Sequence, residues 1–309
     1  MLVDRDHIEL NREALLRGYR HCRQTVRRQL KGQLWMIANL GGDRRRGMDA
    51  LLAHLLTTID LLDLESASGL SLDVWHEIRE DVSDAFRGRC TSSELAALVD
   101  TCRRFEVPRQ FLFDPLRGAD LWIRHRCMET WTDVEVFCSY VGGSTVASWI
   151  PVLGPLQQGY EQPAIAAGKA IMLTLLLERS VQDLRAHRVF FARQDLEDCQ
   201  VDLSMVRMRR PSSAWRHLVR RYTARIEPWF DQAAQLLECL DFDGRRSMSS
   251  LLGLSWRTMA EMRRNPEGIL SEEGVLTRKQ RLAFRTRHLL GLSPDLPWIT
   301  EANAHGHHV

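Results

Sequence analysis

The chain contains very little lysine. Its only lysines are Lys31, Lys169 and Lys279, so arginine carries nearly all of the positive charge, as is typical of a GC-rich bacterial genome. The 42 basic and 40 acidic residues nearly balance, and the formal net charge is +2. A chain without a strong positive excess lacks the overall charge that attracts nucleic acid. We interpret the local clusters "DRRRG" and "RMRRP" as solvated surface and expect no nucleic-acid partner.

Cysteine motifs and long apolar runs are also missing. The seven cysteines form neither a CxxC pair nor a Cys/His spacing suited to a metal. Scattered cysteines are typical of a reducing compartment, so we expect a cytoplasmic protein. The start "MLVDRDHIELNREALLRGYR" lacks the apolar core of a signal peptide. The most apolar run, "AIAAGKAIMLTLLLERS", contains Lys169 and ends near Glu178, so we predict a buried helix there and no transmembrane segment.

Alternating strand patterns and long linkers are nearly absent, whereas helical periodicity is strong. Apolar residues recur three and four positions apart in segments such as "GMDALLAHLLTTIDLLDL" and "AWRHLVRRYTARIEPWFDQAAQLLECL". Ser71, and either Thr91 or Ser92, are suited to cap helices. The segments that separate the predicted helices, such as "ESASGLS" and "VLGPLQQGYEQP", are short. We predict one all-α, single-domain helical bundle over residues 1–295 and a flexible polar tail over 296–309.

Two acidic residues stand near the end of the apolar segment "LLTTIDLLDLES". Asp60 and Asp63 are three positions apart and therefore share a helix face. Like charges on one face disfavour each other unless a cation or water lies between them. Mg²⁺ takes oxygen ligands and often completes its shell with phosphate oxygens. The pattern fits either a divalent-cation site or an ordinary solvated surface.

A second polar group follows the apolar run in "TLLLERSVQDLRAHRVFF". It sets Glu178, Arg179, Gln182 and Asp183 at helical spacing. Arg179 and Asp183 share a face and could form a simple surface ion pair. If the polar end faces inward with the apolar run before it, both charges need partners, and a phosphate with a metal would satisfy them.

The order of these segments resembles the squalene/phytoene synthase family, helical enzymes that condense prenyl diphosphates. The resemblance extends from roughly Tyr19 to Leu290. "YRHCRQTVRRQLKGQLWMIANLGGDRRRGMDALLAHLLTTIDLLD" is similar to the family's opening and first aspartate-rich motif, and "FEVPRQFLFDPLRGADLWIRHRCMETWTDVEVFCSYVGG" to its central segment. "GKAIMLTLLLERSVQDLRAHRVFFARQDL" is similar to its second aspartate-rich motif. The resemblance implies a bundle of the isoprenoid synthase type around a central cavity.

The first motif departs from the family pattern, which is usually Asp-Asp-x-x-Asp. Here Ile59 takes the position of the leading acid, leaving Asp60 and Asp63. The basic residue that precedes this motif in the family has become Leu56. The resemblance still implies that Asp60 and Asp63 contact Mg²⁺, in a site weakened by the lost carboxylate.

The second motif departs further. Glu178 and Arg179 stand where the family has Arg-Asp, and Gln182 replaces a Glu, whereas Asp183 and Arg188 are retained. The resemblance implies a third metal contact at Asp183. It also implies diphosphate contacts at Arg179 and Arg188, where a guanidinium provides a bidentate phosphate donor in place of one metal contact.

These departures favour one diphosphate over two. Ionising an allylic diphosphate requires positive charge on its leaving oxygens, from metal, arginine or both. Head-to-head members must hold two charged donors, for which fewer acids and altered basic residues are poorly suited. Some squalene-synthase-like enzymes prenylate carbazole-type aromatic molecules. We therefore expect a prenyltransferase of secondary metabolism that transfers a dimethylallyl or longer group from its diphosphate to an electron-rich acceptor such as a carbazole or indole.

Four further residues are candidate substrate contacts. Arg27 and Lys31 lie four positions apart on the first predicted helix and could approach a diphosphate, although a solvated basic face fits equally. Gln33 and Thr174 are candidate polar contacts to an acceptor. Tryptophans in these segments are interpreted mainly as core.

Two alternatives remain open. The first is a head-to-head prenyl diphosphate synthase of the squalene or phytoene type, with an imperfectly aligned motif. The second is a non-catalytic relative that keeps the helical shell to bind lipid or a partner protein. Fold resemblance alone does not distinguish them.

Overall fold

The structure is a computed structural model that describes residues 12–30, 34–68, 72–125 and 127–290, without the side chains of 61–74 and 124–125. Lys31, Gln33, Ser71, the tail over 296–309 and the side chain of Asp63 therefore lie outside the described residues. Within them the chain forms helices, two isolated β-bridges and no β-strand. The helices are α1 (Arg12–Gln29), η1 (Leu34–Ile37), α2 (Gly42–Ser68), α3 (Leu72–Phe86), α4 (Ser93–Arg104), α5 (Gln110–His125), α6 (Trp131–Cys138), η2 (Ser139–Gly143), α7 (Ser144–Leu153), α8 (Glu161–Arg185), α9 (Arg193–Asp198), α10 (Leu203–Arg207), α11 (Ser213–Ala234), η3 (Gln235–Cys239), α12 (Phe242–Arg264), η4 (Pro266–Leu270) and α13 (Arg278–Leu289).

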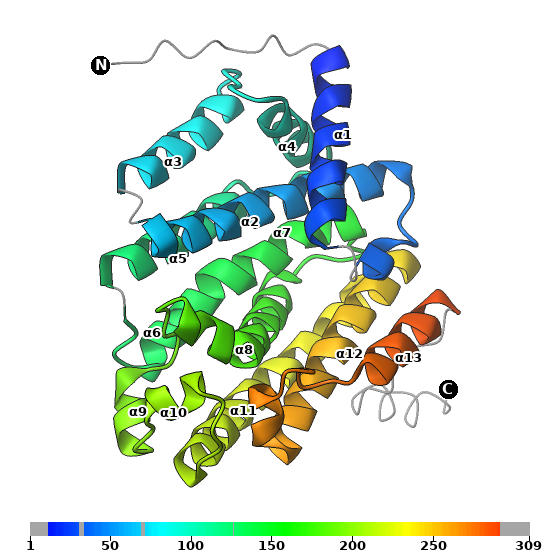
Figure 1. The fold of residues 1–309 in the computed structure, drawn as a ribbon. Helices are drawn as coiled ribbons and strands as arrows, with labels where there is room; N and C mark the ends of the chain where they lie inside the picture. The colour runs from blue at the N-terminus through cyan, green and yellow to red at the C-terminus, as the bar shows by residue number, and fades with distance from the viewer. Residues whose placement is uncertain (1–11, 31–33, 69–71, 126, 291–309) are drawn as a thin grey trace.

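Helix α8 is the central helix of the bundle. Figure 1 shows it between α6 and α7 on one side and α11 and α12 on the other, and it packs against all four. The apolar run predicted to be a buried helix forms this element, and its residues from Ala164 to Leu184 are mostly buried. The expected all-α fold is confirmed.

Two glycines bring α8 close to the helix that precedes it. A Cβ added to Gly168 would lie 2.1 Å from the carbonyl oxygen of Gly142, and one added to Gly142 would lie 2.3 Å from the carbonyl oxygen of Gly168. Side chains at these positions would force the two backbones apart. The contact therefore requires glycine on both sides.

Helices α6, η2 and α7 form one continuous helical stretch, Trp131–Leu153, in which η2 is a π-helical turn. By length and composition alone this stretch could cross a membrane, but 72% of its most apolar window is buried inside the protein. Such burial is typical of a core helix. A capping box starts the stretch, in which Thr130 and Asp133 exchange hydrogen bonds.

One predicted cap is confirmed and one predicted boundary moved. The cap of α4 is Ser92, whose hydroxyl accepts a hydrogen bond from the Leu95 amide at 3.2 Å. The segment "ESASGLS" was expected to be a connection between helices, but α2 continues through Ser68. Glu, Ala and Ser carry no strong helix-breaking penalty, so the helix begun by the apolar residues extends through them.

Candidate active site

The polar end of α8 has one solvent-accessible stripe, which we call the α8 stripe: Leu175, Glu178, Arg179 and Gln182. These residues are three or four positions apart, so they share one helix face. Leu177 and Val181, between them in the chain, are buried. The stripe is thus an accessible, mainly polar edge on a helix whose residues from Ala164 to Leu184 are otherwise mostly buried.

The two charges of the α8 stripe have different environments. Glu178 accepts a hydrogen bond from a guanidinium nitrogen of Arg281 in α13 at 2.6 Å. Arg179 is half-buried and forms no hydrogen bond or ion pair with any residue that the structure describes. An arginine side chain with its five donors uncommitted can bind an oxyanion.

Asp183 and Arg188 lie together just beyond this stripe. Both are buried, and Arg188 donates to the Asp183 carboxylate from Nη2 at 2.5 Å and from Nε at 3.1 Å. The Arg188 amide also donates to the Asp183 carbonyl at 2.8 Å. His187 adopts a left-handed backbone conformation with φ of 59°, which reverses the chain so that the two side chains meet. The predicted metal contact and diphosphate contact are therefore joined in a buried ion pair.

The first motif offers a more accessible carboxylate. Asp60 is exposed on α2 and accepts a hydrogen bond from the side chain of Gln29 at 2.6 Å. Gln29 ends α1, so the contact fastens the end of that helix next to the motif. Arg27, two residues earlier, is also exposed.

An apolar cavity of about 100 Å³ lies among η1, α2, α7 and α12. Its lining includes Leu30, just after α1, and contains no charged residue within the described part of the chain. Ser247 contributes a hydroxyl, which donates to the side chain of Asn39 at 3.0 Å. The lining residues are Leu30, Leu34, Met36, Ile37, Met48, Leu52, Trp149, Leu153, Ser247, Met248 and Leu251. Such a lining suits a hydrocarbon chain or an aromatic ring.

A model of the squalene/phytoene synthase family, described as "Squalene/phytoene synthase", matches residues 26–284. The chain belongs to this family. Membership confirms the resemblance inferred from the two motifs and assigns the chain to a family of prenyltransferases.

Curated squalene/phytoene synthase family members of similar sequence include plant enzymes. The chain is 25% identical over 250 residues to a chloroplastic phytoene synthase of Narcissus pseudonarcissus, covering 78% of this chain and 58% of that protein. It is 26% identical over 257 residues to phytoene synthase 3 of Zea mays, covering 80% of this chain and 60% of that protein. The chain thus matches about three fifths of the length of these relatives.

Solved structures of similar fold include a dehydrosqualene synthase in complex with ligand. Its TM-score is 0.79 at 16% identity, over 90% of this chain and 97% of that one. A squalene synthase from Alicyclobacillus acidocaldarius has a TM-score of 0.72 at 17% identity, over 82% of this chain and 96% of that one. These likenesses confirm the isoprenoid synthase fold. The names of all four proteins denote phytoene, squalene or dehydrosqualene synthases, so they favour the head-to-head alternative over the aromatic acceptor.

The described side chains do not by themselves form a magnesium site. No group of three or more His, Cys, Asp or Glu residues is close enough to hold a metal ion among the residues described. Asp60 is accessible, whereas Asp183 is committed to Arg188. The predicted Mg²⁺ contacts at Asp60, Asp63 and Asp183 stay predictions from the sequence.

Thr174 has a structural explanation. Its side chain is buried, and its hydroxyl donates to the Ala170 carbonyl at 2.7 Å within α8. A hydroxyl bonded to its own helix in this way is satisfied without a ligand. The predicted contacts at Thr174 and Arg27 remain untested by this geometry.

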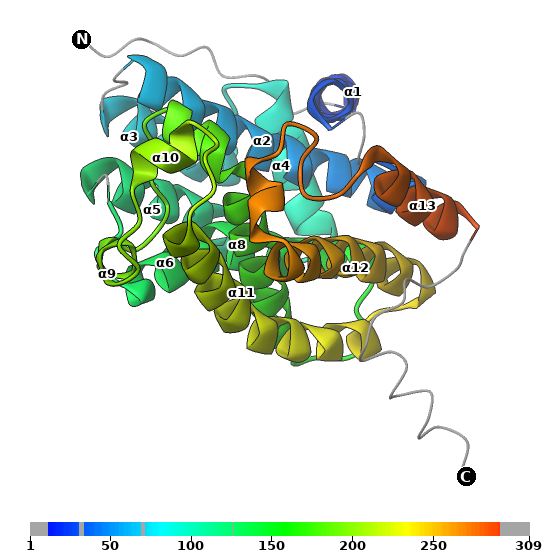
Figure 2. The same ribbon diagram turned by 60° about the horizontal axis from the view of Figure 1, so that its bottom comes forward.

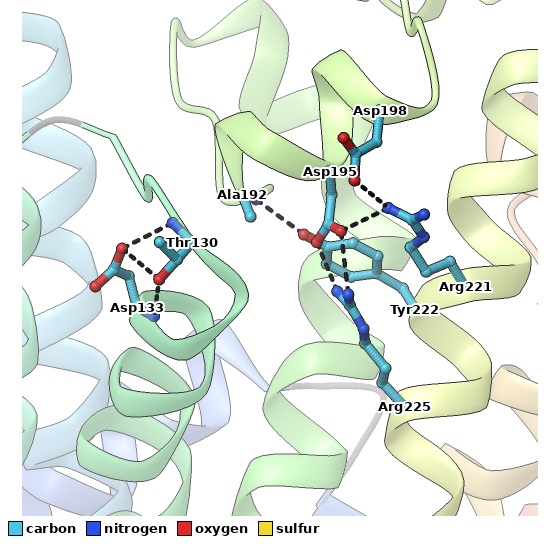
Figure 3. A network of polar contacts seen from close by, with 8 residues as sticks. All are labelled: Thr130, Asp133, Ala192, Asp195, Asp198, Arg221, Tyr222 and Arg225. Carbon is cyan, nitrogen blue, oxygen red and sulfur yellow. Dashed lines mark hydrogen bonds and ion pairs between the residues drawn. The ribbon is translucent and has the colours of Figure 1, made fainter.

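A charged network beyond the second motif was not predicted. Figure 3 shows the carboxylate of Asp195 between two arginines of α11. Arg225 donates to it at 2.6 and 3.1 Å, and Arg221 at 2.9 Å. Burial raises the pKa of Asp195, but these arginines outweigh burial and the net pKa is lowered. The network joins α9 to α11. Its only signal in the sequence is the pair Asp195-Leu196, which ends the segment that is similar to the family's second aspartate-rich motif.

Proposed function

We propose that this protein transfers an allylic prenyl group from one prenyl diphosphate to an uncharged, electron-rich aromatic acceptor such as a carbazole or indole. One observation carries the proposal. On the accessible face of α8, Arg179 has no ion-pair or hydrogen-bond partner among the described residues, while the one acid retained in this motif, Asp183, is buried against Arg188. This helix therefore offers a guanidinium to a ligand rather than a row of carboxylates.

Charge supports one bound diphosphate rather than two. A diphosphate requires compensating positive charge, from arginine directly or from metal ions held by carboxylates. The described carboxylates do not form a metal cluster, and Arg179 supplies one fixed cation. That arrangement suits a single donor, paired with an acceptor that brings no charge of its own.

The proposed transfer proceeds in two bond changes. The allylic C–O bond breaks, and the bonding electrons leave with the diphosphate, whose developing charge Arg179 would stabilise. A ring carbon of the acceptor then forms the new C–C bond, and loss of its proton restores aromaticity. We further propose a cytoplasmic role in bacterial secondary metabolism, in keeping with the scattered thiols and arginine-rich composition.

A second function is favoured by the comparisons. Head-to-head condensation of two prenyl diphosphates is what the names phytoene, squalene and dehydrosqualene synthase denote in the relatives. The two proposals share the ionisation step and differ in the acceptor. They are therefore separable by supplying the donor alone.

The deciding experiment measures diphosphate release from dimethylallyl, geranyl, farnesyl and geranylgeranyl diphosphates, with and without Mg²⁺. Each donor is supplied alone and then with a panel of indoles and carbazoles. We expect release that depends on the acceptor, together with a prenylated aromatic product detected by mass spectrometry. A C30 or C40 hydrocarbon from the donor alone would establish the second function instead. Absence of release under every condition would refute both and favour a non-catalytic binding role.

Arg179 is tested directly by substitution. Arg179→Gln removes the guanidinium, and we expect release to slow by about 10²- to 10³-fold, the usual cost of one donor to a developing oxyanion. Arg185→Gln is the matched control, because Arg185 is exposed near the end of the same helix. Arg179→Asp restores the family's residue. Faster diphosphate release by that variant would show that Arg179 impairs the site rather than contacting the phosphate.

A further inference from the structure

Four of the most exposed apolar side chains come from chain segments that meet at one end of the bundle. They are Leu156 (67% exposed), Phe242 (76%), Leu289 (54%) and Leu290 (69%), which we call the end patch. Singly exposed apolar residues are common on protein surfaces, but a cluster of them marks a contact surface. The end patch therefore requires an explanation beyond the fold.

Backbone contacts hold these segments together. The Leu156 amide donates to the Cys239 carbonyl at 2.8 Å, three residues before Phe242. Arg246, one helical turn after Phe242, donates to the Leu289 carbonyl at 3.3 Å and also to the His288 carbonyl. The segment from Cys239 to Arg246 thus contacts both the loop after α7 and the end of α13. In both ribbon views α13 lies beside α12 (Figures 1 and 2).

Helix α13 adds an outward stripe that is basic and apolar. Arg278, Leu282, Arg285 and Leu289 are spaced by four, three and four residues, so they share one helix face, and all four are exposed. The two arginines form no ion pair with any described residue. Lys279 is exposed beside them, and the described segment 278–290 contains no acidic residue.

The end patch adjoins the apolar cavity. Leu153 lines the cavity three residues before Leu156, and Ser247 and Met248 line it just after the turn of α12 that begins at Phe242. Helix α13 packs on η1, whose residues line another side. The exposed apolar residues and the one uncharged cavity described above therefore belong to the same end of the protein.

We propose that the end patch and the outward stripe of α13 together dock on an anionic lipid bilayer, next to the apolar cavity. Exposed Phe and Leu side chains enter the boundary between headgroups and acyl chains, while Arg278, Lys279 and Arg285 contact lipid phosphates. This placement lets an apolar molecule pass between bilayer and cavity with little exposure to water. The docking does not depend on which acceptor the enzyme uses.

Charge favours a lipid surface over a second copy of the chain. A symmetric dimer through this face would bring the basic stripes of both copies into one interface, and their like charges would oppose association. An anionic bilayer supplies both the negative charge and the apolar interior that the face presents. Acidic Glu238 and Asp243 lie near the start of α12, so we expect the charge attraction to come chiefly from α13.

The test is co-flotation of the full chain with vesicles. We expect binding to vesicles that contain phosphatidylglycerol, weaker binding to phosphatidylcholine alone, and a decline at high salt. Replacing Arg278, Lys279 and Arg285 with Gln should weaken binding by about fivefold per charge removed. The matched control replaces Arg207, Arg210 and Arg220, three exposed arginines on and near α10 and α11, and should leave binding unchanged.

The apolar part is tested separately. Phe242→Ser with Leu290→Ser should reduce partition to anionic vesicles by about tenfold or more, because two apolar side chains no longer leave water. Met208→Ser with Leu16→Ser removes comparably exposed apolar residues elsewhere and should have no effect. In Figure 1, α10 lies at the lower left and α13 at the right.

Three results would overturn the proposal. The first is no binding to anionic vesicles by the unmodified chain, and the second is equal loss in the control variants. The third is a dimer by light scattering that Phe242→Ser with Leu290→Ser converts to a monomer, which would make the end patch an interface between copies. Because binding is measured without substrate, these outcomes are independent of the proposed transferase activity.

Discussion

Removing the guanidinium of Arg188 should destabilise the protein severely. Arg188 and Asp183 are 7% and 4% exposed, and two hydrogen bonds of 2.5 and 3.1 Å join their side chains. In Arg188→Met the apolar part of the side chain is largely kept, but the buried carboxylate of Asp183 loses the positive charge and the two hydrogen bonds that Arg188 supplies. Breaking a buried pair by removing one partner costs about 3–5 kcal/mol of unfolding free energy. We expect a loss of that order.

A double-mutant cycle identifies the origin of the loss. Asp183→Asn leaves the arginine buried beside a neutral amide and should also cost about 3 kcal/mol. The double variant, Asp183→Asn with Arg188→Met, removes both charges of the pair. Its loss should be smaller than the sum of the two single losses by about 2 kcal/mol or more, because residues in contact are not additive.

The measurement is urea unfolding followed by circular dichroism, with the slope of free energy against urea compared between variants. Glu197→Gln is the control, because Glu197 pairs with Arg193 on the exposed surface at 2.6 Å and should cost at most about 1 kcal/mol. Additive single variants that each cost less than the control would refute the reasoning. If Asp183→Asn instead lost diphosphate release at full stability, Asp183 would be a ligand contact rather than a structural partner.

Three further predictions concern other parts of the fold. Gly168→Ala places a Cβ 2.1 Å from the carbonyl oxygen of Gly142, so we expect a fall in thermal midpoint of several degrees, whereas an unchanged midpoint would mean that the helices separate freely. Tyr222→Phe removes the hydroxyl that accepts a hydrogen bond from the Ala192 amide at 2.8 Å, and should lower the unfolding free energy measured in urea by about 1–3 kcal/mol. An unchanged unfolding free energy would show that water replaces the hydroxyl. Burial and the nearby positive charge of an arginine lower the pKa of His288 from 6.5 to about 4, so the unfolded chain takes up a proton there that the folded chain resists. Stability from this residue is complete above pH 6.5 and declines by up to about 3 kcal/mol toward pH 4, and His288→Asn should flatten that dependence in unfolding measured between pH 7 and pH 5.

Much of the fold was predictable from local pattern. The apolar run "AIAAGKAIMLTLLLERS" predicts the buried helix α8, because apolar side chains at helical spacing are a property of the local sequence. The order of the two motifs predicted the family, and the family model confirms it. Boundaries were less predictable: α2 extends through Ser68, and of the two caps that the sequence offered for α4, Thr91 and Ser92, the structure uses Ser92.

The candidate site was predictable as a set of positions but not as a set of contacts. The sequence placed Arg179 and Asp183 on one face of a helix, and helical spacing alone supports an ion pair between them. The structure instead pairs Asp183 with Arg188, because the left-handed turn at His187 folds the chain back.

By itself, then, the sequence determined the helices, the family and the loss of acids from both motifs, because periodicity and residue identity are local properties. Only the tertiary structure decided which charges are committed. Glu178 meets Arg281 across 103 positions of sequence, and Leu289 meets the start of α12 through Arg246. Such pairings depend on how the helices pack, and a charge's partner determines whether it remains available for a ligand.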